Sequence, residues 1–496
     1  MRDTTSGTTT NNTPTEETLD PQNWDEMRTV GHQMVDDMLD YLMSVRQRPI
    51  WQSVPDGVKP SFAEPAPENG LGPAETYEQF KKFVLPYPMG TIHPRFWGWV
   101  IGSGTPFGML SEMLAATLNV NASGFKVVAG DVENQVVKWC KEMLGYPQEA
   151  SGILVSGGSM ANLVGLAVAL QSKAGVDFSR DGLLGSTKRF TVYASAETHS
   201  SVAKAVRLFG LGTGSLRLIP VNEDFSVNLT ALRDTIAKDK AEGLQPFCII
   251  GNAGTVNTGA FDALDDIADI CEKERLWFHV DGAFGALAAL STSANTFVKG
   301  MERADSLAFD LHKWMYMPYE VGCTLIRRAD EHQKAFAVRA TYLQPQTRGY
   351  AAGDTLWHER GLQLSRGFRA LKVWMSIKEH GVAKYRRLIQ QNIDQAQYLA
   401  ALVKDSANLE ILAPHPLNIV CFRFRAEGKS DEQLNKVNEE ILMRIQERGI
   451  AIPSSTLIHG KYAFRVAITN HRSRNDDFKA LVDSVVSIGK EVLAGI

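Results

Sequence analysis

Two short runs of the sequence place a charged side chain directly after an apolar segment, where it could do chemistry. In residues 306–314 (SLAFDLHKW), the pair His312-Lys313 closes an apolar run. A lysine amine that lies in a pocket, rather than on a solvated face, can form a Schiff base with a carbonyl group. In residues 277–285 (WFHVDGAFG), Asp281 ends another apolar run, and a buried carboxylate there needs a cationic or hydrogen-bonding partner. A protonated ring nitrogen would be such a partner and would let the ring accept electrons.

Two further runs could hold an anion and a flat ring. In residues 155–162 (VSGGSMAN), Gly158 and Ser159 precede an apolar helical stretch, and a helix start with small residues favours a bound phosphate. His199 closely follows an apolar run and could stack on a planar ring. Each run alone also fits a role without chemistry: Lys313 could be a surface lysine, and Asp281 a helix cap. The Gly-Ser run could be an ordinary turn, and His199 a core histidine. The ordered set is far more specific, because the phosphate turn, the histidine, the aspartate and the His-Lys pair follow one another along the chain.

The elements that must position these residues alternate between short β-branched or apolar runs and helical segments. Such alternation predicts an α/β fold with a mostly parallel sheet that is covered on both faces. Ligands of such folds bind beyond the carboxyl ends of the strands, where the polar residues named above stand. The expected strands of this sheet are residues 152–155, 190–194, 216–221, 247–251, 276–280 and 306–309, and those of a smaller C-terminal unit are 419–424 and 462–468, with a helix over 431–448 between them.

We expect four parts along the chain. Residues 1–20 are rich in Thr and Asn and predict a disordered tail. Residues 21–90 form a helical and extended segment, with helical apolar spacing over 24–45, that packs on a partner subunit. Residues 91–380 form the large domain, and residues 381–496 form a small α/β domain.

Composition narrows the class of protein. A net charge of −4 does not favour a nucleic-acid or anionic-membrane partner. No apolar run is long enough to span a bilayer, and the N-terminus has no apolar leader. The five cysteines are scattered, without the spacing of a metal site, which predicts reduced thiols in a cytoplasmic protein and no metal.

Taken together, these runs resemble the group II pyridoxal-phosphate-dependent decarboxylases of fold type I, and among them the aromatic L-amino acid decarboxylases. The resemblance covers the chain from about Trp24 to its end, and the His-Lys-Trp and His-Val-Asp-Gly-Ala runs are its most specific parts. It implies a large domain with a seven-stranded sheet, pyridoxal 5'-phosphate as cofactor, and a homodimer with active sites at the interface. The residues that it places at the cofactor are Lys313 as the Schiff-base lysine, Asp281 at the ring nitrogen, His199 on the ring face, Gly158, Ser159 and His312 around the phosphate, and Ala283, Thr255 and Asp310 near the cofactor.

Two positions refine what the resemblance implies. Asp310 stands where the mammalian enzymes usually carry Asn, and a carboxylate near a phosphate is repelled unless a cation or a proton intervenes. Tyr342 resembles the tyrosine of a mobile loop that protonates the carbanionic intermediate of decarboxylases, whereas relatives with Phe there tend to be aldehyde synthases. Tyr342 therefore predicts an amine as the product.

The expected substrate is an aromatic amino acid such as tryptophan, tyrosine, phenylalanine or DOPA. Trp99 and Val100 lie in a run that resembles the substrate-pocket segment of the family, and an aromatic wall suits a flat apolar side chain. Phe125 resembles a residue that reaches the pocket from the neighbouring subunit. Arg366 matches an arginine of the family near the active site.

Three alternatives stay open. An aldehyde synthase or a transaminase could use the same fold, although Tyr342 and the His-Lys-Trp run argue against them. A decarboxylase of an acidic substrate such as glutamate would need a dedicated cation, for which Arg95 is the candidate. A binding protein with a degenerate site is disfavoured, because nothing is missing from the expected set.

Overall fold

The computed structural model describes residues 17–124, 126–175, 178–338, 346–350, 352 and 356–495. The predicted tail up to residue 16, Phe125 and Tyr342 therefore lie outside the described residues. The chain divides into two compact units: residues 1–44 with 54–87, and residues 45–53 with 88–496.

The first unit is helical. Its α1 (Trp24–Met43) confirms the helix predicted from apolar spacing, and the Asn23 side chain caps it by accepting hydrogen bonds from two backbone N–H groups. The hydroxyl of Tyr77 in α2 (Pro73–Gln79) donates to Asp37 of α1 at 2.9 Å. Burial and the neighbouring carboxylate raise the pKa of Tyr77 to about 12.

The second unit contains a seven-stranded sheet in the order β2-β8-β7-β6-β5-β3-β4. All six predicted strands of the large sheet are present, and the neighbours along β4-β3-β5-β6-β7 are parallel. The sequence prediction missed β8, a short buried strand that runs antiparallel between β2 and β7. The strands are β2 (Ser151–Val155), β3 (Phe190–Ser195), β4 (Leu216–Ile219), β5 (Gln245–Asn252), β6 (Trp277–Asp281), β7 (Ser306–Asp310) and β8 (Gly322–Ile326).

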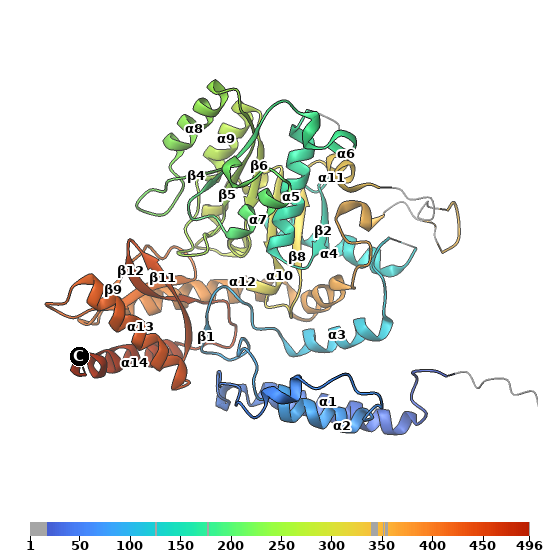
Figure 1. The fold of residues 1–496 in the computed structure, drawn as a ribbon, viewed down its shortest axis with the longest axis vertical. Coiled ribbons are helices and arrows are strands. Elements are labelled where there is room, and N and C mark those ends of the chain that lie inside the picture. Colours follow the sequence, from blue (N-terminus) through green and yellow to red (C-terminus); the bar gives the residue numbers. More distant parts are fainter. Residues whose placement is uncertain are drawn as a thin grey trace, which may run out of the picture. The chain divides into compact units, whose positions relative to one another are not determined.

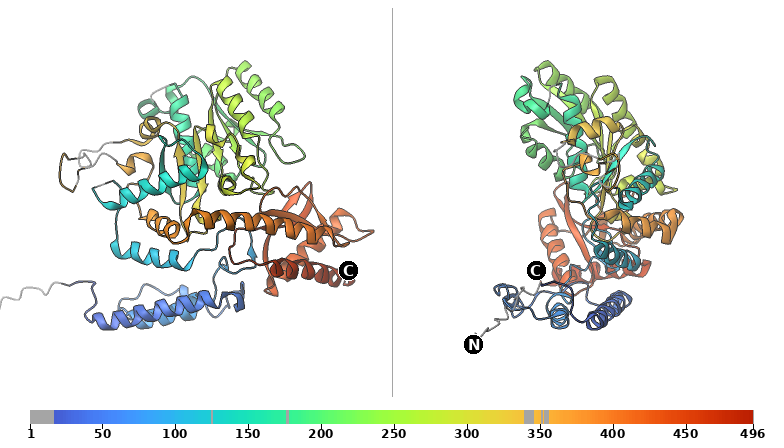
Figure 2. Two further views of the ribbon diagram at one scale, coloured as in Figure 1. Left: turned by 180° about the vertical axis from the view of Figure 1, so that it is seen from behind. Right: turned by 90° about the vertical axis from the view of Figure 1, so that its right-hand side faces the viewer.

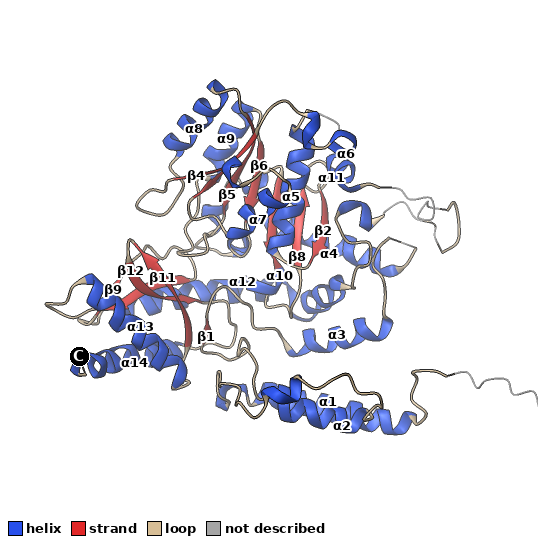
Figure 3. Ribbon diagram, viewed as in Figure 1, coloured by secondary structure: helices blue, strands red, loops and turns tan. Residues whose placement is uncertain are grey.

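Helices cover both faces of this sheet (Figures 1 and 3). On one face α5 packs on β5, β6, β7 and β8 and lies beside α7, while α8 and α9 belong to connections that run back across the other face. Apart from the edge strand β4, the strands are buried along nearly their whole length, which explains why they appear in the sequence as continuous apolar runs. The helices of this part are α3 (Pro106–Leu118), α4 (Val128–Leu144), α5 (Gly158–Lys173), α6 (Phe178–Asp181), α7 (Ser200–Leu208), α8 (Leu229–Ala241), α9 (Leu264–Glu274), α10 (Leu311–Trp314) and α11 (Ala329–Phe336).

The C-terminal part has its own sheet and apolar core. Its five strands have the order β1-β11-β12-β10-β9, and their side chains form a core with α13, α14 and the end of α12. The long helix α12 contacts both sheets and bends at Gly381, where φ is 69°, at the residue where we expected the small domain to begin (Figure 2). The elements are β1 (Phe96–Trp97), α12 (Arg369–Lys404), β9 (Leu409–Ile411), β10 (Ile419–Phe424), α13 (Asp431–Glu447), β11 (Ile452–Ile458), β12 (Lys461–Ala467) and α14 (Asn475–Ala494).

Helix length and hydropathy bear on a possible membrane span. Among the described residues, no helix is both long enough and apolar enough to cross a bilayer.

Candidate active site

The predicted cofactor residues meet at the carboxyl edge of the large sheet. Because β2, β3, β6 and β7 point the same way, the residues that follow them converge there. They line a cavity of about 380 Å³ that includes eight of the nine predicted cofactor residues. These eight are Gly158, Ser159, His199, Asp281, Ala283, Asp310, His312 and Lys313.

The start of α5 forms one end of the cavity. No side chain caps this helix, so its first N–H groups are available to an anion. The two glycines are needed for space: a Cβ on Gly157 would lie 3.1 Å from the ring of His312, and one on Gly158 would lie 2.7 Å from Asp310 Oδ2. A side chain at Gly158 would therefore press against Asp310.

Lys313 enters the cavity from α10, directly after β7. Its Nζ lies 2.8 Å from Asp310 Oδ2. The other carboxylate oxygen of Asp310 is buried and has no hydrogen-bond partner. A buried, half-satisfied carboxylate is costly unless something else binds beside it, so this atom marks a place where a ligand or a proton belongs.

His312 and Tyr319 form the wall beside the glycine turn. Their rings lie with centroids 4.5 Å apart, and Nδ1 of His312 lies 2.9 Å from the carbonyl oxygen of Val321. Burial lowers the pKa of His312, so the ring is neutral near pH 7. Burial likewise raises the pKa of Tyr319 to about 12.

Asp281, another residue that lines the cavity, is held as a hydrogen-bond acceptor. Its Oδ2 accepts from Nδ2 of Asn162 at 2.8 Å, and its Oδ1 accepts from the backbone N–H of Ala283 at 3.2 Å. Burial is the largest effect on the pKa of His199 and lowers it. The nearby charge of Asp281 raises this pKa, and that of Lys313 lowers it further. The histidine is thus neutral, and a neutral ring can stack on a planar ligand without charge repulsion.

The sequence prediction missed Asn162 and Tyr319. Asn162 follows Ser159 by three residues on α5, so the two side chains share one helix face. This spacing could have predicted that Asn162 lies near the cavity. Tyr319 lies in the irregular segment before β8, and no pattern in the sequence pointed to it.

Other predicted residues lie away from this cavity. The hydroxyl of Thr255 is within 3.1 Å of the Thr258 hydroxyl and accepts from a backbone N–H in its own turn. Trp99 is exposed and Val100 is buried, and neither is among the cavity residues.

Arg366 lies in the protein interior. Its guanidinium makes two hydrogen bonds with Glu133, at 2.5 and 3.0 Å, and one each with the carbonyl oxygens of Ala122 and Leu154. Both charged side chains are almost fully buried, so breaking the pair would leave an uncompensated charge. This geometry favours a supporting role for Arg366, and its predicted contact with substrate stays a prediction.

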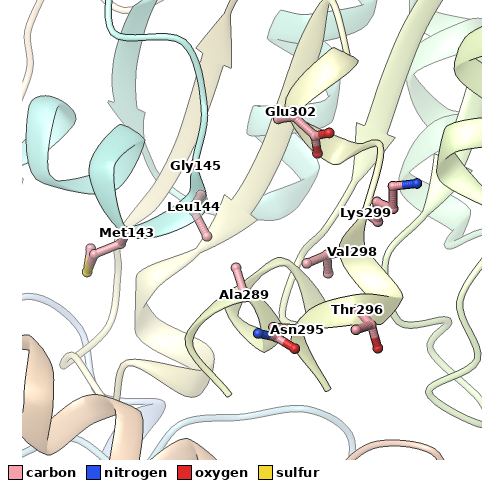
Figure 4. Close-up of a pocket in the computed structure, with 9 residues that line it drawn as sticks. All are labelled: Met143, Leu144, Gly145, Ala289, Asn295, Thr296, Val298, Lys299 and Glu302. Atoms are coloured by element: carbon pink, nitrogen blue, oxygen red, sulfur yellow. The ribbon is translucent and has the colours of Figure 1, made fainter. Parts of the chain in front are cut away.

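A second pocket, of about 420 Å³, lies between the end of α4 and residues 289–302 (Figure 4). Its lysine, Lys299, is ion-paired with Asp265 at 3.0 Å, and none of its lining residues is a predicted cofactor residue. Within the described part of the chain, no cluster of His, Cys, Asp and Glu could hold a metal ion. The chemistry therefore points to the cavity at the sheet edge.

That cavity fits pyridoxal phosphate. The uncapped helix start and Ser159 suit its phosphate, Asp281 suits a protonated ring nitrogen, and Lys313 lines the same cavity with an amine that could hold the aldehyde carbon. The glycines of the turn pack against His312 and Asp310, where a side chain would not fit.

Comparisons with known proteins agree with this geometry. The family model described as the pyridoxal-dependent decarboxylase conserved domain matches residues 55–425. An aromatic-L-amino-acid decarboxylase of Bacillus atrophaeus is 34% identical over 94% of this chain and 96% of its own, and a phenylacetaldehyde synthase of Petunia hybrida is 30% identical over 91% of each chain. The crystal structure of Oryza sativa TDC with PLP and tryptamine has the same fold, with a TM-score of 0.89, 24% identity, and coverage of 96% of this chain and 99% of that one. The chain therefore belongs to the pyridoxal-dependent decarboxylases, enzymes that use pyridoxal phosphate to remove the carboxyl group of an amino acid.

Proposed function

We propose that this decarboxylase acts on an aromatic L-amino acid and releases the corresponding amine and CO2. The observation that carries the proposal is the cavity in which Lys313, Asp281 and His199 lie beside the uncapped start of α5. The aromatic preference is supported by the relative from Bacillus atrophaeus, an aromatic-L-amino-acid decarboxylase.

We assign each residue of the cavity a role in binding the cofactor from its position. Pyridoxal phosphate, when bound, supplies an electron-accepting ring that stabilises the charge left on Cα as CO2 departs. Lys313 would hold the cofactor through its Nζ. The start of α5 and Ser159 would bind the phosphate, and Asp281 would favour a proton on the ring nitrogen. His199 would lie against the ring and exclude water from it.

Tyr342 completes the reaction in this proposal by donating the phenolic proton to Cα. A positioned general acid of this kind is worth roughly 10²–10⁴-fold in rate. The Petunia hybrida relative, a phenylacetaldehyde synthase, supports the aldehyde-forming reaction as the second candidate. The tyrosine at position 342 favours the amine.

An acidic substrate has less support. Arg95, the candidate cation, has its Nε 3.2 Å from Asp477 and is not among the cavity residues. A side-chain carboxylate of the substrate would therefore have to compete with Asp477 for this arginine.

We also propose a homodimer with active sites at the interface. Large apolar side chains are exposed on the single chain, among them Trp99, Met113, Leu118 and Val128, and a second copy could cover them. Homodimers are the commonest assembly that buries a self-complementary surface. Light scattering on the purified protein tests this, and a monomer at micromolar concentration would contradict it.

A reducing compartment, the cytoplasm, suits the five cysteines. All five are buried and free of disulfide bonds. Fractionation of the source cells tests this part of the proposal.

The decisive experiment is a substrate panel. The protein, supplied with pyridoxal phosphate, is incubated separately with tryptophan, tyrosine, phenylalanine, DOPA and glutamate, and CO2, amine and hydrogen peroxide are measured together. We expect amine and CO2 in equal amounts from an aromatic substrate, without peroxide. Aldehyde with peroxide would favour the synthase, and CO2 from glutamate alone would overturn the aromatic preference. Lys313→Ala is the control for reaction by free cofactor.

A further inference from the structure

We propose that three buried side chains, Asn162 in the cavity wall and His279 and Ser306 behind it, act as positioning residues that hold Asp281 as a hydrogen-bond acceptor. This inference rests on the proposed role of Asp281 at the ring nitrogen of the cofactor and extends it into the interior of the sheet. We call the three residues the support chain.

The support chain is continuous from the sheet interior to the cavity. Nε1 of Trp277 donates to Ser306 Oγ at 2.7 Å, and this hydroxyl lies 2.7 Å from Nδ1 of His279. Nε2 of His279 lies 2.9 Å from Asn162 Oδ1. The amide nitrogen of Asn162 then donates to Asp281 Oδ2 at 2.8 Å.

The chemistry of its ends fixes the direction of every hydrogen bond. The indole N–H of Trp277 can only donate, so the Ser306 oxygen accepts there and its hydroxyl hydrogen is free for Nδ1 of His279. An ionised Asp281 can only accept, so the amide nitrogen of Asn162 faces it and the amide oxygen faces His279. The consistent solution is a neutral His279 with its proton on Nε2.

His279 stays neutral across the physiological range. Its side chain is fully buried, and burial lowers its pKa to about 3. Its hydrogen-bonding neighbours, Ser306 and Asn162, are uncharged, so nothing near it stabilises a second proton. The support chain therefore carries no charge of its own, and its hydrogen bonds fix the orientation of the Asn162 amide towards Asp281.

Helix α5 has a glycine, Gly165, where it packs against His279 and Ser306. A Cβ on Gly165 would lie 2.6 Å from Cε1 of His279 and 3.3 Å from Ser306 Oγ. A glycine at this position lets the helix pack directly on the imidazole. The same helix presents Ser159 to the phosphate end of the cavity and Asn162 to Asp281, so one rigid element sets both ends of the site.

A branch of the support chain reaches the ring-stacking histidine. The amide nitrogen of Asn162 also donates to Ser201 Oγ at 3.0 Å, and this hydroxyl lies 2.9 Å from Nδ1 of His199. Turning the Asn162 amide over would place its oxygen against both Asp281 and Ser201. Such a turn would oppose the ionised form of Asp281 and would disturb His199 as well.

The inference is tested by the protonation of the cofactor's ring nitrogen. Wild type, Ser306→Ala and Asn162→Asp are loaded with pyridoxal phosphate that carries ¹⁵N in the ring, and solid-state NMR reports whether that nitrogen holds a proton as the pH is varied. Equilibrium dialysis of the same proteins gives the dissociation constant of the cofactor. Ser306→Ala removes the group that fixes the tautomer without touching the cavity, and Asn162→Asp keeps the shape of the side chain but opposes Asp281.

We expect Ser306→Ala to lose the ring proton at lower pH than wild type does, because Asp281 is then less firmly oriented. We expect Asn162→Asp to lose it at higher pH, because a second carboxylate favours the charged ring nitrogen. Both variants should bind the cofactor about tenfold more weakly, since each leaves a buried hydrogen bond misdirected. The matched control is Thr324→Val, which removes a fully buried hydroxyl of the adjacent strand β8 that bonds to the Ala161 carbonyl of α5 at 3.0 Å. It should match wild type in both measurements.

Wild-type ring protonation and affinity in both Ser306→Ala and Asn162→Asp would overturn the inference. Asp281→Asn separates it from the proposed function. If Asp281→Asn shifts ring protonation while the two support-chain variants do not, Asp281 keeps its role and only the support chain fails. If Asp281→Asn itself changes nothing, the proposed role of Asp281 fails and the support chain fails with it.

Discussion

The cofactor side and the substrate side of this enzyme are built differently. Eight of the nine predicted cofactor residues line one cavity formed by strand ends and the start of α5. On the substrate side, Trp99 is exposed, Arg366 is bound to Glu133 in the interior, and Phe125 and Tyr342 lie outside the described residues. The described residues of a single chain thus bring the predicted cofactor residues together in one cavity, but they do not bring the predicted substrate residues together.

The difference follows from what each side must do. Holding the cofactor requires several groups at fixed distances, which strands and a packed helix provide. Selecting a substrate and closing over it uses loops and, in our proposal, a second chain. Variants on the cofactor side should therefore change cofactor binding and rate together, whereas variants on the substrate side should leave cofactor binding intact.

The largest effect is expected from Lys313→Ala. Without its amine the protein should not retain pyridoxal phosphate as a lysine-bound species after dialysis, and kcat should fall by about 10⁴-fold or more. Visible absorption and CO2 release measure the two effects. A dialysed variant that keeps the wild-type absorption band would show that another residue holds the cofactor.

Tyr342→Phe should change the product rather than cofactor binding. We expect amine formation to fall by roughly 10²–10⁴-fold, as for loss of a general acid, with aldehyde and peroxide appearing in its place. The dissociation constant of pyridoxal phosphate should stay at the wild-type value. Unchanged amine formation would mean that a different group protonates Cα.

Asp310→Asn should strengthen cofactor binding. The carboxylate lies against the glycine turn, with one oxygen bonded to Lys313 and the other without a hydrogen-bond partner. An amide of the same shape removes a negative charge beside the proposed place of the phosphate, so we expect the dissociation constant of pyridoxal phosphate to fall about tenfold. Equilibrium dialysis measures this constant, and an unchanged or weaker affinity would contradict the account.

Trp99→Ala tests the substrate side. If this exposed side chain forms part of an aromatic wall, KM for the preferred aromatic substrate should rise about tenfold, which corresponds to about 1.4 kcal/mol. Cofactor affinity should stay unchanged. Leu184→Ala, which removes a still more exposed apolar side chain far along the chain from Trp99, is the control and should leave KM as in wild type.

The smallest effect concerns how the free energy of unfolding depends on pH through the buried side chain of His332. His332 is fully buried between Ser151 Oγ at 2.6 Å and the Arg360 carbonyl at 2.7 Å, and burial lowers its pKa to about 3. The unfolded chain gains a proton at this histidine below about pH 6.5 and the folded chain does not, so stability falls with pH from about 6.5 towards 3, by at most about 1.4 kcal/mol per pH unit. His332→Gln should lose less stability than wild type between pH 7 and pH 5 in denaturant titrations, and equal losses would contradict the assignment.

The sequence was informative where local pattern and chemistry coincide. Apolar runs with a polar residue at their end predicted the strand that ends at Asp281 and the strand that ends just before Lys313, because a strand buried on both faces must be apolar until it reaches the sheet edge. Small residues before a helical stretch predicted the phosphate turn at Gly158 for a similarly local reason.

Only the tertiary structure decided the partners of these residues. The antiparallel insertion of β8, the pairing of Arg366 with Glu133, and the support chain from Ser306 through His279 to Asn162 all join positions far apart in the sequence. A hydrogen bond depends on where two side chains finish in space, and no local pattern encodes that position. The chain by itself therefore determined which chemistry is present, and the packing of sheet and helix determined how that chemistry is oriented.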